Sequence, residues 1–203
     1  VELSRLHLSE LSEVLPYMPR LTGLFSAEAK YIQTATSLQV SAEANIDELT
    51  YERQQVGDIG LGATWLPGDG GTHYLNTYFM IDNQEVLTAD GILTQKNGKD
   101  TLEVTTSFEH FPLRIANAFV PDRMVSFTGD VDGGMYIYGP LEKPQMHGDI
   151  SLDSVSVYAR QAGARYWFDN RPLQIKDNQL IFDKFAIYTT SKNPFTVDGK
   201  VDF

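Results

Sequence analysis

The 203-residue chain contains no cysteine, which excludes disulfides, thiolate nucleophiles and cysteine-ligated metal sites. It has no apolar run that approaches the roughly 18 residues needed by a membrane-spanning helix. Its 16 Lys and Arg residues are scattered among 27 Asp and Glu residues, and the formal net charge is −11. Proteins that bind nucleic acid, or that are held electrostatically on anionic lipid, need a concentrated cationic face. Both classes are disfavoured, and we expect no nucleic-acid partner.

Catalytic and metal-binding motifs are also scarce. The Asp- and Gly-rich segment 129–134 resembles a calcium loop, but Leu141 stands where an EF-hand needs its twelfth-position Glu. The segment 57–62 contains Gly-x-Gly, but it lies in an alternating strand pattern and opens no helix. No Gly-x-Ser-x-Gly motif occurs. The histidines lack the spacing of paired metal ligands: His7, His73, His110 and His147. We therefore predict no catalytic residue, no metal and no cofactor, and we do not expect an enzyme.

What the sequence does contain is a strict alternation of apolar and polar residues. The segments 38–46, 59–65, 102–108 and 146–152 each place an apolar or small residue at every second position, as half-buried strands do. Turn-forming residues separate such runs: Pro67–Gly71, Asp82-Asn83, Lys96–Lys99, Asp132–Gly134, Asp169–Pro172 and Lys176–Asn178. Intervals of about 8 to 15 residues leave little room for crossover helices. The pattern predicts an all-β chain with roughly fifteen mostly antiparallel strands.

Two short segments depart from this alternation. Ser9 can cap a helix that runs to Leu15 and is stopped by Pro16. The segment from Ile115 to Val120 repeats the arrangement, with Pro121 as its stop. We expect one or two short amphipathic helices, which either cover an end of the sheet or fill a corner of its core.

The sequence also indicates an internal repeat. Leu21-Thr22-Gly23 recurs as Phe127-Thr128-Gly129 at an offset of 106, and Thr88-Ala89-Asp90-Gly91 recurs as Thr196-Val197-Asp198-Gly199 at 108. A period of this kind is typical of an array in which each unit covers its neighbour's open edge. We predict a first β unit over residues 1–107 and a second, truncated unit over 108–203. Together they would form one continuous groove segment of a larger protein.

From Val125 onward, the pattern resembles a known family. Its elements are Phe127-x-Gly129, Met135-x-Ile137-x-Gly139, Pro144, Gly148-x-Ile150-x-Leu152 and Val155-x-Val157. This series is similar to that of the TamB family of bacterial envelope proteins, the inner-membrane component of the translocation and assembly module, and of its AsmA-like relatives. The first half departs from the series, because Gln33, Leu38 and Ala42 stand where the second half has Gly139, Pro144 and Gly148.

The resemblance implies an elongated, open, U-shaped sheet, called a β-taco, with an apolar concave groove. It implies a periplasmic location in a Gram-negative envelope, an inner-membrane anchor outside this sequence, and an outer-membrane barrel partner of the TamA or BamA type. The implied role is phospholipid transport between the two membranes, outer-membrane protein assembly, or both. Phospholipid acyl chains would be the ligand.

The groove lining follows from the apolar phase of each strand. The residues that we predict to face the groove are Val40, Ala42, Ile46, Ile59, Leu61, Val104, Phe108, Ile150, Leu152, Val155 and Val157. A second function class fits the same strands and acidic surface, namely a non-catalytic structural β-repeat scaffold or an adhesin-like module of the cell envelope. Such a scaffold would have a solidly packed interior, whereas a lipid conduit needs an open apolar surface.

Overall fold

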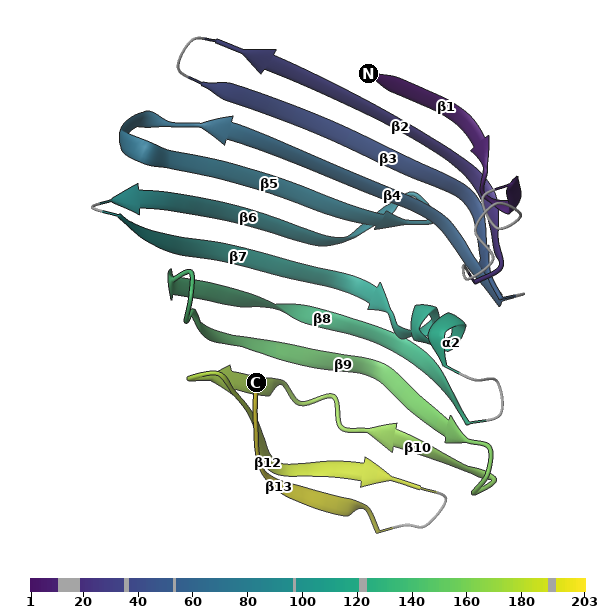
Figure 1. Ribbon diagram of the computed structural model, residues 1–203. Coiled ribbons are helices and arrows are strands. Elements are labelled where there is room, and N and C mark those ends of the chain that lie inside the picture. The colour runs from purple at the N-terminus through teal and green to yellow at the C-terminus, as the bar shows by residue number, and fades with distance from the viewer. Residues whose placement is uncertain (11–18, 35–36, 53, 97, 121–123, 190–192) are drawn as a thin grey trace. The chain divides into compact units, whose positions relative to one another are not determined.

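The structure is a computed structural model that describes residues 1–203 except 11–18, 35–36, 53, 97, 121–123 and 190–192. It contains thirteen strands, fewer than the roughly fifteen predicted, and the paired strands whose register is defined are antiparallel. The predicted all-β fold class is confirmed (Figure 1). The chain divides into two compact units: a first unit of Val1–Thr106 and Tyr138–Pro144, and a second unit of Ser107–Ile137 and Gln145–Phe203. The predicted repeat boundary between residues 107 and 108 stays a prediction.

The first unit is a meander in which each strand pairs with the next. Its strands are β1 (Glu2–His7), β2 (Leu21–Gln33), β3 (Leu38–Tyr51), β4 (Gln54–Pro67), β5 (Thr72–Ile81), β6 (Gln84–Lys96) and the first part of β7 (Lys99–Pro112). A 3₁₀ turn, η1 (Asp69–Gly71), joins β4 to β5. Asp82 and Asn83, both with positive φ, form the tight turn between β5 and β6. This is the backbone conformation that two-residue hairpins favour.

The second unit contains the remainder of β7 and most of β8. Its strands are β8 (Val125–Pro140), β9 (Gln145–Ala159), β10 (Ala164–Phe168), β11 (Leu173–Lys176), β12 (Gln179–Tyr188) and β13 (Phe195–Asp202). β10 and β11 both pair with β9 on one side and with β12 on the other. They therefore act as one strand that is interrupted over residues 169–172.

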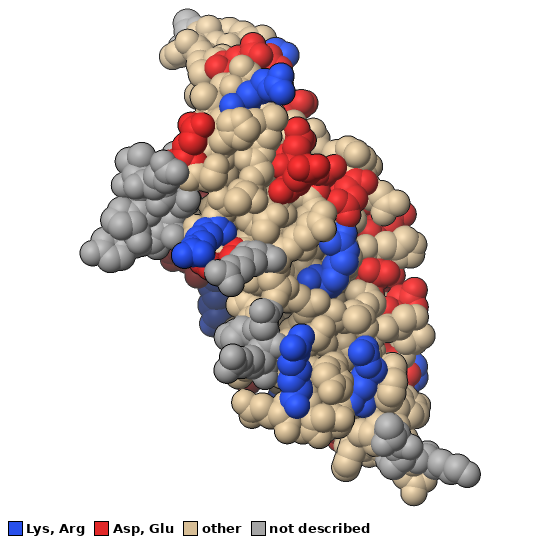
Figure 2. All heavy atoms as spheres, turned by 90° about the vertical axis from the view of Figure 1, so that its right-hand side faces the viewer, with Lys and Arg blue, Asp and Glu red and all other residues tan. Residues whose placement is uncertain are grey.

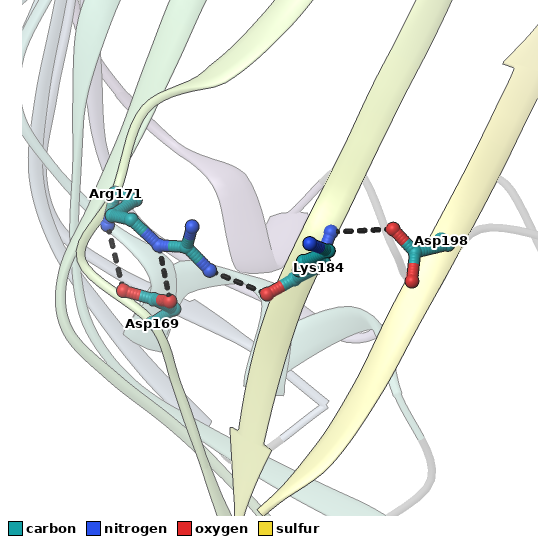
Figure 3. A network of polar contacts seen from close by, with 4 residues as sticks. All are labelled: Asp169, Arg171, Lys184 and Asp198. Atoms are coloured by element: carbon teal, nitrogen blue, oxygen red, sulfur yellow. Dashed lines mark hydrogen bonds and ion pairs between the residues drawn. The ribbon is translucent and has the colours of Figure 1, made fainter.

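A polar network fixes residues 169–172, which separate β10 from β11 (Figure 3). The Asp169 carboxylate accepts hydrogen bonds from the backbone N–H of Arg171 at 3.1 Å and from its Nε at 2.6 Å. The Arg171 guanidinium also donates to the carbonyl of Lys184 on β12. The Lys184 backbone N–H donates to Asp198 on β13 at 2.7 Å. The network thus ties the loop between β10 and β11 to the next two strands.

Among the described residues, five strands share a backbone irregularity that we call a bulge, and the pairing register shifts at those of β1, β3 and β12. In each, a residue with positive φ follows a polar residue, and apolar residues flank the pair. The positive-φ residues are Arg5, Glu48, His110, Ser154 and Lys184. The flanking apolar residues are three positions apart, as with Ile46 and Leu49, where the register of β3 against β4 shifts. A bulge adds one residue to a strand, so residues i and i+3 across it share a face.

At three of these bulges, the carboxylate of an aspartate on a neighbouring strand accepts a hydrogen bond from the backbone N–H of the positive-φ residue. The N–H of Glu48 donates to Asp58 at 2.8 Å, and the N–H of His110 donates to Asp132 at 2.8 Å. The N–H of Lys184 donates to Asp198, as described above. Each carboxylate supplies the acceptor that the disrupted ladder no longer provides.

The predicted turn at Asp132–Gly134 is wrong, because these residues lie inside β8. Asp132 serves the His110 bulge instead, where its carboxylate also lies 3.0 Å from the His110 Nδ1. Gly133 has a φ of +137°, and a Cβ at this position would lie 2.2 Å from the carbonyl oxygen of Asp149. A glycine is therefore needed for close approach to β9, and not for a reversal of the chain.

The second predicted helix, Ile115 to Val120, is confirmed as η2 (Leu113–Ile115) followed by α2 (Ala116–Phe119). Asn117 on α2 brackets one residue of β8, because its amide donates to the carbonyl of Phe127 at 2.9 Å and accepts from the Phe127 N–H at 2.6 Å. This side chain substitutes for a neighbouring strand at that point. The first predicted helix, Ser9 to Leu15, lies mostly outside the described residues.

Candidate functional site

The strand register gives the first unit one continuous apolar face. Successive rows cross the sheet at right angles to the strands, and each row joins residues paired on adjacent strands. One row is Phe25, Ile46, Ile59 and Ile81; the next is Ala27, Ala44, Leu61, Phe79 and Leu87; the third is Ala29, Ala42, Ala63, Thr77 and Ala89; the fourth is Tyr31, Val40, Trp65 and Leu75. Because side chains alternate between faces, all four rows lie on the same side of the sheet.

Small alanine side chains line the bottom of a depression in the middle of this face. The alanine-rich rows on β2, β3 and β4 leave a cavity of about 220 Å³, which Val1, Leu3 and Leu61 also line. A side chain of one carbon fills little of the space above a sheet, whereas the larger neighbours rise beside it. We call this cavity, with its lining residues from β1 to β4, the alanine groove.

Larger apolar residues of the groove are open to the surroundings. Leu3 is 47% exposed and Leu61 is 49% exposed. Contiguous apolar surface of this kind marks a site for a partner or ligand more often than scattered apolar residues do.

The predicted lining residues of the first unit fall on this face. Val40, Ala42, Ile46, Ile59 and Leu61 all belong to the four rows. Val104 on β7 lies against β6, where a Cβ on Gly91 would be 3.4 Å from its Cγ2. That this face contacts lipid stays a prediction.

The predicted lining residues of the second unit lie in a more filled environment. Val155 is 3% exposed, and Phe108 lies edge-on to Phe111 across its bulge, with ring centroids 6.2 Å apart. Ile150 pairs with the buried Leu173 on β11. The other two are half-buried: Leu152 and Val157, the latter paired with Tyr166. The structure therefore places the predicted residues in two different settings.

Sequence reasoning missed part of the groove. Leu3, Ala27 and Ala29 line the cavity but were not predicted. The segment 25–31 alternates as clearly as the segments 38–46 and 59–65, with Phe25, Ala27, Ala29 and Tyr31 in one phase. Alanine carries a weak apolar signal, so the alternation of this segment does not by itself indicate a groove-lining strand.

An aromatic pair bounds the apolar face near the β4–β5 hairpin. The rings of Trp65 and His73 stack, with centroids 4.9 Å apart and planes inclined by 21°. The Nδ1 atom of His73 is buried and has no hydrogen-bond partner in the part of the chain that the structure describes.

The opposite face of the first unit carries charge. Glu2, Glu28 and Glu43 are paired in register across β1, β2 and β3. Lys30 lies 2.9 Å from the Glu28 carboxylate, and this hydrogen bond and charge raise the pKa of Lys30. In the view of Figure 2, acidic side chains gather over part of the molecular surface and basic ones are scattered. Across β1, β2 and β3, an acidic row thus lies on the face opposite the apolar rows.

A larger cavity of about 870 Å³ lies beside the Glu48 bulge and has a mixed polar and apolar lining. His7, Thr22, Asp47, Glu48 and Asp58 are among the residues that line it. Asp58 is already engaged there, since it accepts the hydrogen bond from the Glu48 N–H. Among the described residues, no group of three or more His, Asp or Glu is placed to hold a metal ion. The smaller alanine groove is therefore the better candidate site.

Comparison with protein-family models, curated proteins and solved structures found no match. Within the described residues, the helices are too short to cross a membrane.

Proposed function

We propose that this chain is a periplasmic segment of an envelope protein of the TamB type. In this proposal the alanine groove and the apolar face around it shield phospholipid acyl chains that move between the inner and outer membranes. The full protein would have an inner-membrane anchor and an outer-membrane barrel partner of the TamA or BamA type, and it would serve phospholipid transport, outer-membrane protein assembly, or both. The site would need no catalytic residue or cofactor.

The observation that supports this proposal best is the exposed apolar face of the first unit. A folded chain that leaves Leu3 and Leu61 half exposed around an alanine floor keeps an apolar surface uncovered. Transfer of apolar surface out of water is worth roughly 25 cal/mol per Å², so an occupant of this surface gains stability by covering it.

The physical chemistry of acyl chains suits such a surface. Each methylene exposed to water costs about 0.8 kcal/mol, so an acyl chain in transit needs apolar cover along its whole path. Five adjacent strands, β2 to β6, extend about 19 Å across the sheet at roughly 4.8 Å per strand. The rows of the apolar face run in this direction, and they provide a continuous path without a buried charge.

Photocrosslinking in a Gram-negative envelope tests the proposal. A photoreactive amino acid at Leu61 in the groove should capture phospholipid, which mass spectrometry of the purified chain detects. The matched control is Asn45, which lies on the adjacent strand β3, is exposed on the opposite face and does not line the alanine groove. It should give little or no lipid adduct.

The alternative of a structural scaffold predicts a different result. In that case, neither position should capture lipid, and protein adducts alone should form. Equal lipid capture at both positions would indicate non-specific contact and would also count against transport along this face.

A further inference from the structure

Exposed apolar side chains gather at the hairpin ends of the first unit. Next to the β2–β3 loop, Tyr31 is 65% exposed, Ile32 is 62% exposed and Leu38 is 46% exposed. Near the β4–β5 loop, Tyr74 is 46% exposed and Leu66 is 38% exposed. The two hairpins are neighbours because β3 pairs with β4, where Val40 lies opposite Trp65. We call this region the hairpin end.

These side chains lie on both faces of the same sheet. Tyr31 and Leu38 belong to the apolar face, since Tyr31 pairs with Val40. Ile32, one residue further along, points to the opposite face. Leu66 and Tyr74 are paired with each other on that opposite face, and Ile92 continues their row on β6 with 38% of its surface exposed.

The loops at the hairpin end carry almost no charge. The β2–β3 connection over residues 34–37 contains only Thr, Ala and Ser, and the β4–β5 connection over 68–71 contains one charged residue, Asp69. The first unit as a whole is strongly acidic, with 16 Asp and Glu against 7 Lys and Arg. These two connections are thus weakly charged in an otherwise acidic unit, and the adjacent β6–β7 hairpin carries Lys96, Lys99 and Asp100.

We propose that the hairpin end inserts into the interfacial region of a zwitterionic lipid bilayer. A protein partner that docks on one face of the sheet covers only the side chains of that face. A bilayer interface surrounds an inserted tip, so it covers Tyr31 and Ile32 together. Tyrosines are favoured at this depth because their rings are apolar and their hydroxyl groups remain hydrated. The acidic charge of the unit opposes adhesion to anionic lipid, which selects a zwitterionic surface.

Vesicle flotation with the complete 203-residue chain tests the proposal. The chain should float with phosphatidylcholine vesicles, and the bound fraction should fall when part of the lipid is replaced by phosphatidylglycerol. Tyr31→Glu and Ile32→Glu alter adjacent residues of similar exposure on opposite faces. Each variant should lower the vesicle partition constant about tenfold, because it removes the favourable burial of one large apolar side chain in the lipid interface.

The control is Val201→Glu, which changes a residue on β13 of the second unit that is 52% exposed. It should float as the unaltered chain does. All three variants should keep the far-ultraviolet circular dichroism and melting temperature of the unaltered chain, because the altered side chains are exposed.

Three outcomes would overturn the inference. The first is an absence of flotation with phosphatidylcholine, including the case in which the hairpin end captures a protein instead. The second is a loss of binding for only one of the two glutamate variants, which would indicate a surface that covers a single face. The third is binding that increases with phosphatidylglycerol, which would indicate electrostatic adhesion. None of these outcomes bears on lipid capture at Leu61, so the groove proposal is tested separately.

Discussion

The two units use the same strand bulge but fill the adjoining apolar face differently. In the first unit, Ile46 and Leu49 flank the Glu48 bulge, and the nearby Leu61 remains 49% exposed. In the second unit, Leu152 and Val155 flank the Ser154 bulge, and Val155 is 3% exposed. The charge also differs: 16 acidic against 7 basic residues give −9 in the first unit, whereas 11 against 9 give −2 in the second.

The difference follows from side-chain size and strand arrangement. The first unit places alanines opposite one another on three strands, so its apolar face has a hollow. The second unit has large buried apolar residues on β11, which pairs with β9, and on β12, which pairs with β11; they include Leu173, Ile175 and Phe185. The same strand bulge can therefore occur beside either an open apolar surface or a filled core. Which one forms depends on the residues between the bulges.

The largest expected effect comes from placing arginine in each setting. Val155→Arg should destabilise the chain by about 4 kcal/mol or more, because an unpaired charge would be buried. Leu61→Arg should cost less than about 1 kcal/mol, because the arginine head group can reach water from a half-exposed position. Urea unfolding followed by circular dichroism measures both. Similar losses for the two variants would mean that the first unit is as filled as the second.

The bulges provide a second comparison, through the glycines that pack against them. Gly129→Ala should destabilise by about 2 kcal/mol or more, because its φ is +90° and the new Cβ would lie 2.6 Å from the backbone of Ser154. Gly23→Ala should cost somewhat less, since its nearest contact is the Asp47 carbonyl oxygen at 2.9 Å. The control is Gly163→Ala, where no atom lies within 4 Å and only the strain of positive φ, about 1 kcal/mol, applies. If the three variants have the same melting temperature, close packing of glycine against the bulges does not contribute to the stability of the fold.

A smaller effect should come from the network at the interrupted strand of the second unit. Burial acts to raise the pKa of Asp169, but the hydrogen bonds and charge of Arg171 outweigh it and hold that pKa below its usual range. The folded state then gains stability that is complete above the unfolded pKa of about 3.9 and is lost as the pH falls through the lower folded value. Asp169→Asn should lower the melting temperature by roughly 2–5 °C at pH 7. The gap to the unaltered chain should narrow below about pH 4, and a gap independent of pH would contradict this role.

The smallest effect is expected at the acidic face of the first unit. Lys30→Met removes an exposed ion pair with Glu28, in which the Lys30 side chain is 75% exposed. Exposed pairs contribute little because water and salt screen them, so the melting temperature should not change measurably in 0.15 M salt. A clear decrease would show that Lys30 relieves repulsion among the row of Glu2, Glu28 and Glu43.

Much of the fold could be predicted from alternation and turn chemistry. Pro67–Gly71 and Asp82-Asn83 are turns as predicted, because glycine, and asparagine or aspartate with positive φ, favour chain reversal. The bulges could not be recognised beforehand, since Glu48 and Ser154 are ordinary residues whose positive φ depends on neighbouring strands. The shared face of Leu152 and Val155 needs such a bulge, because simple alternation would place residues three apart on opposite faces.

The bulges also agree in position with the repeat seen in the sequence. Arg5 and His110 are 105 residues apart, Gly23 and Gly129 are 106 apart, and Glu48 and Ser154 are 106 apart, and all six have positive φ. The repeat itself stays a prediction. The alanine groove was only partly predicted, because pairing of small residues across strands is a property of register and not of any single strand.

The two tryptophans allow the most direct test of the central claim, that the apolar face of the first unit holds acyl chains. Trp65 lies on that face, whereas Trp167 in the second unit pairs with Ser156 and is 40% exposed. Fluorescence quenching by a lysophospholipid with a nitroxide on its acyl chain, below its micelle concentration, would be compared between the single-tryptophan variants Trp167→Phe and Trp65→Phe. Saturable quenching of Trp65 with little effect on Trp167 is the predicted result. Equal quenching of both, or none of Trp65, would contradict the account.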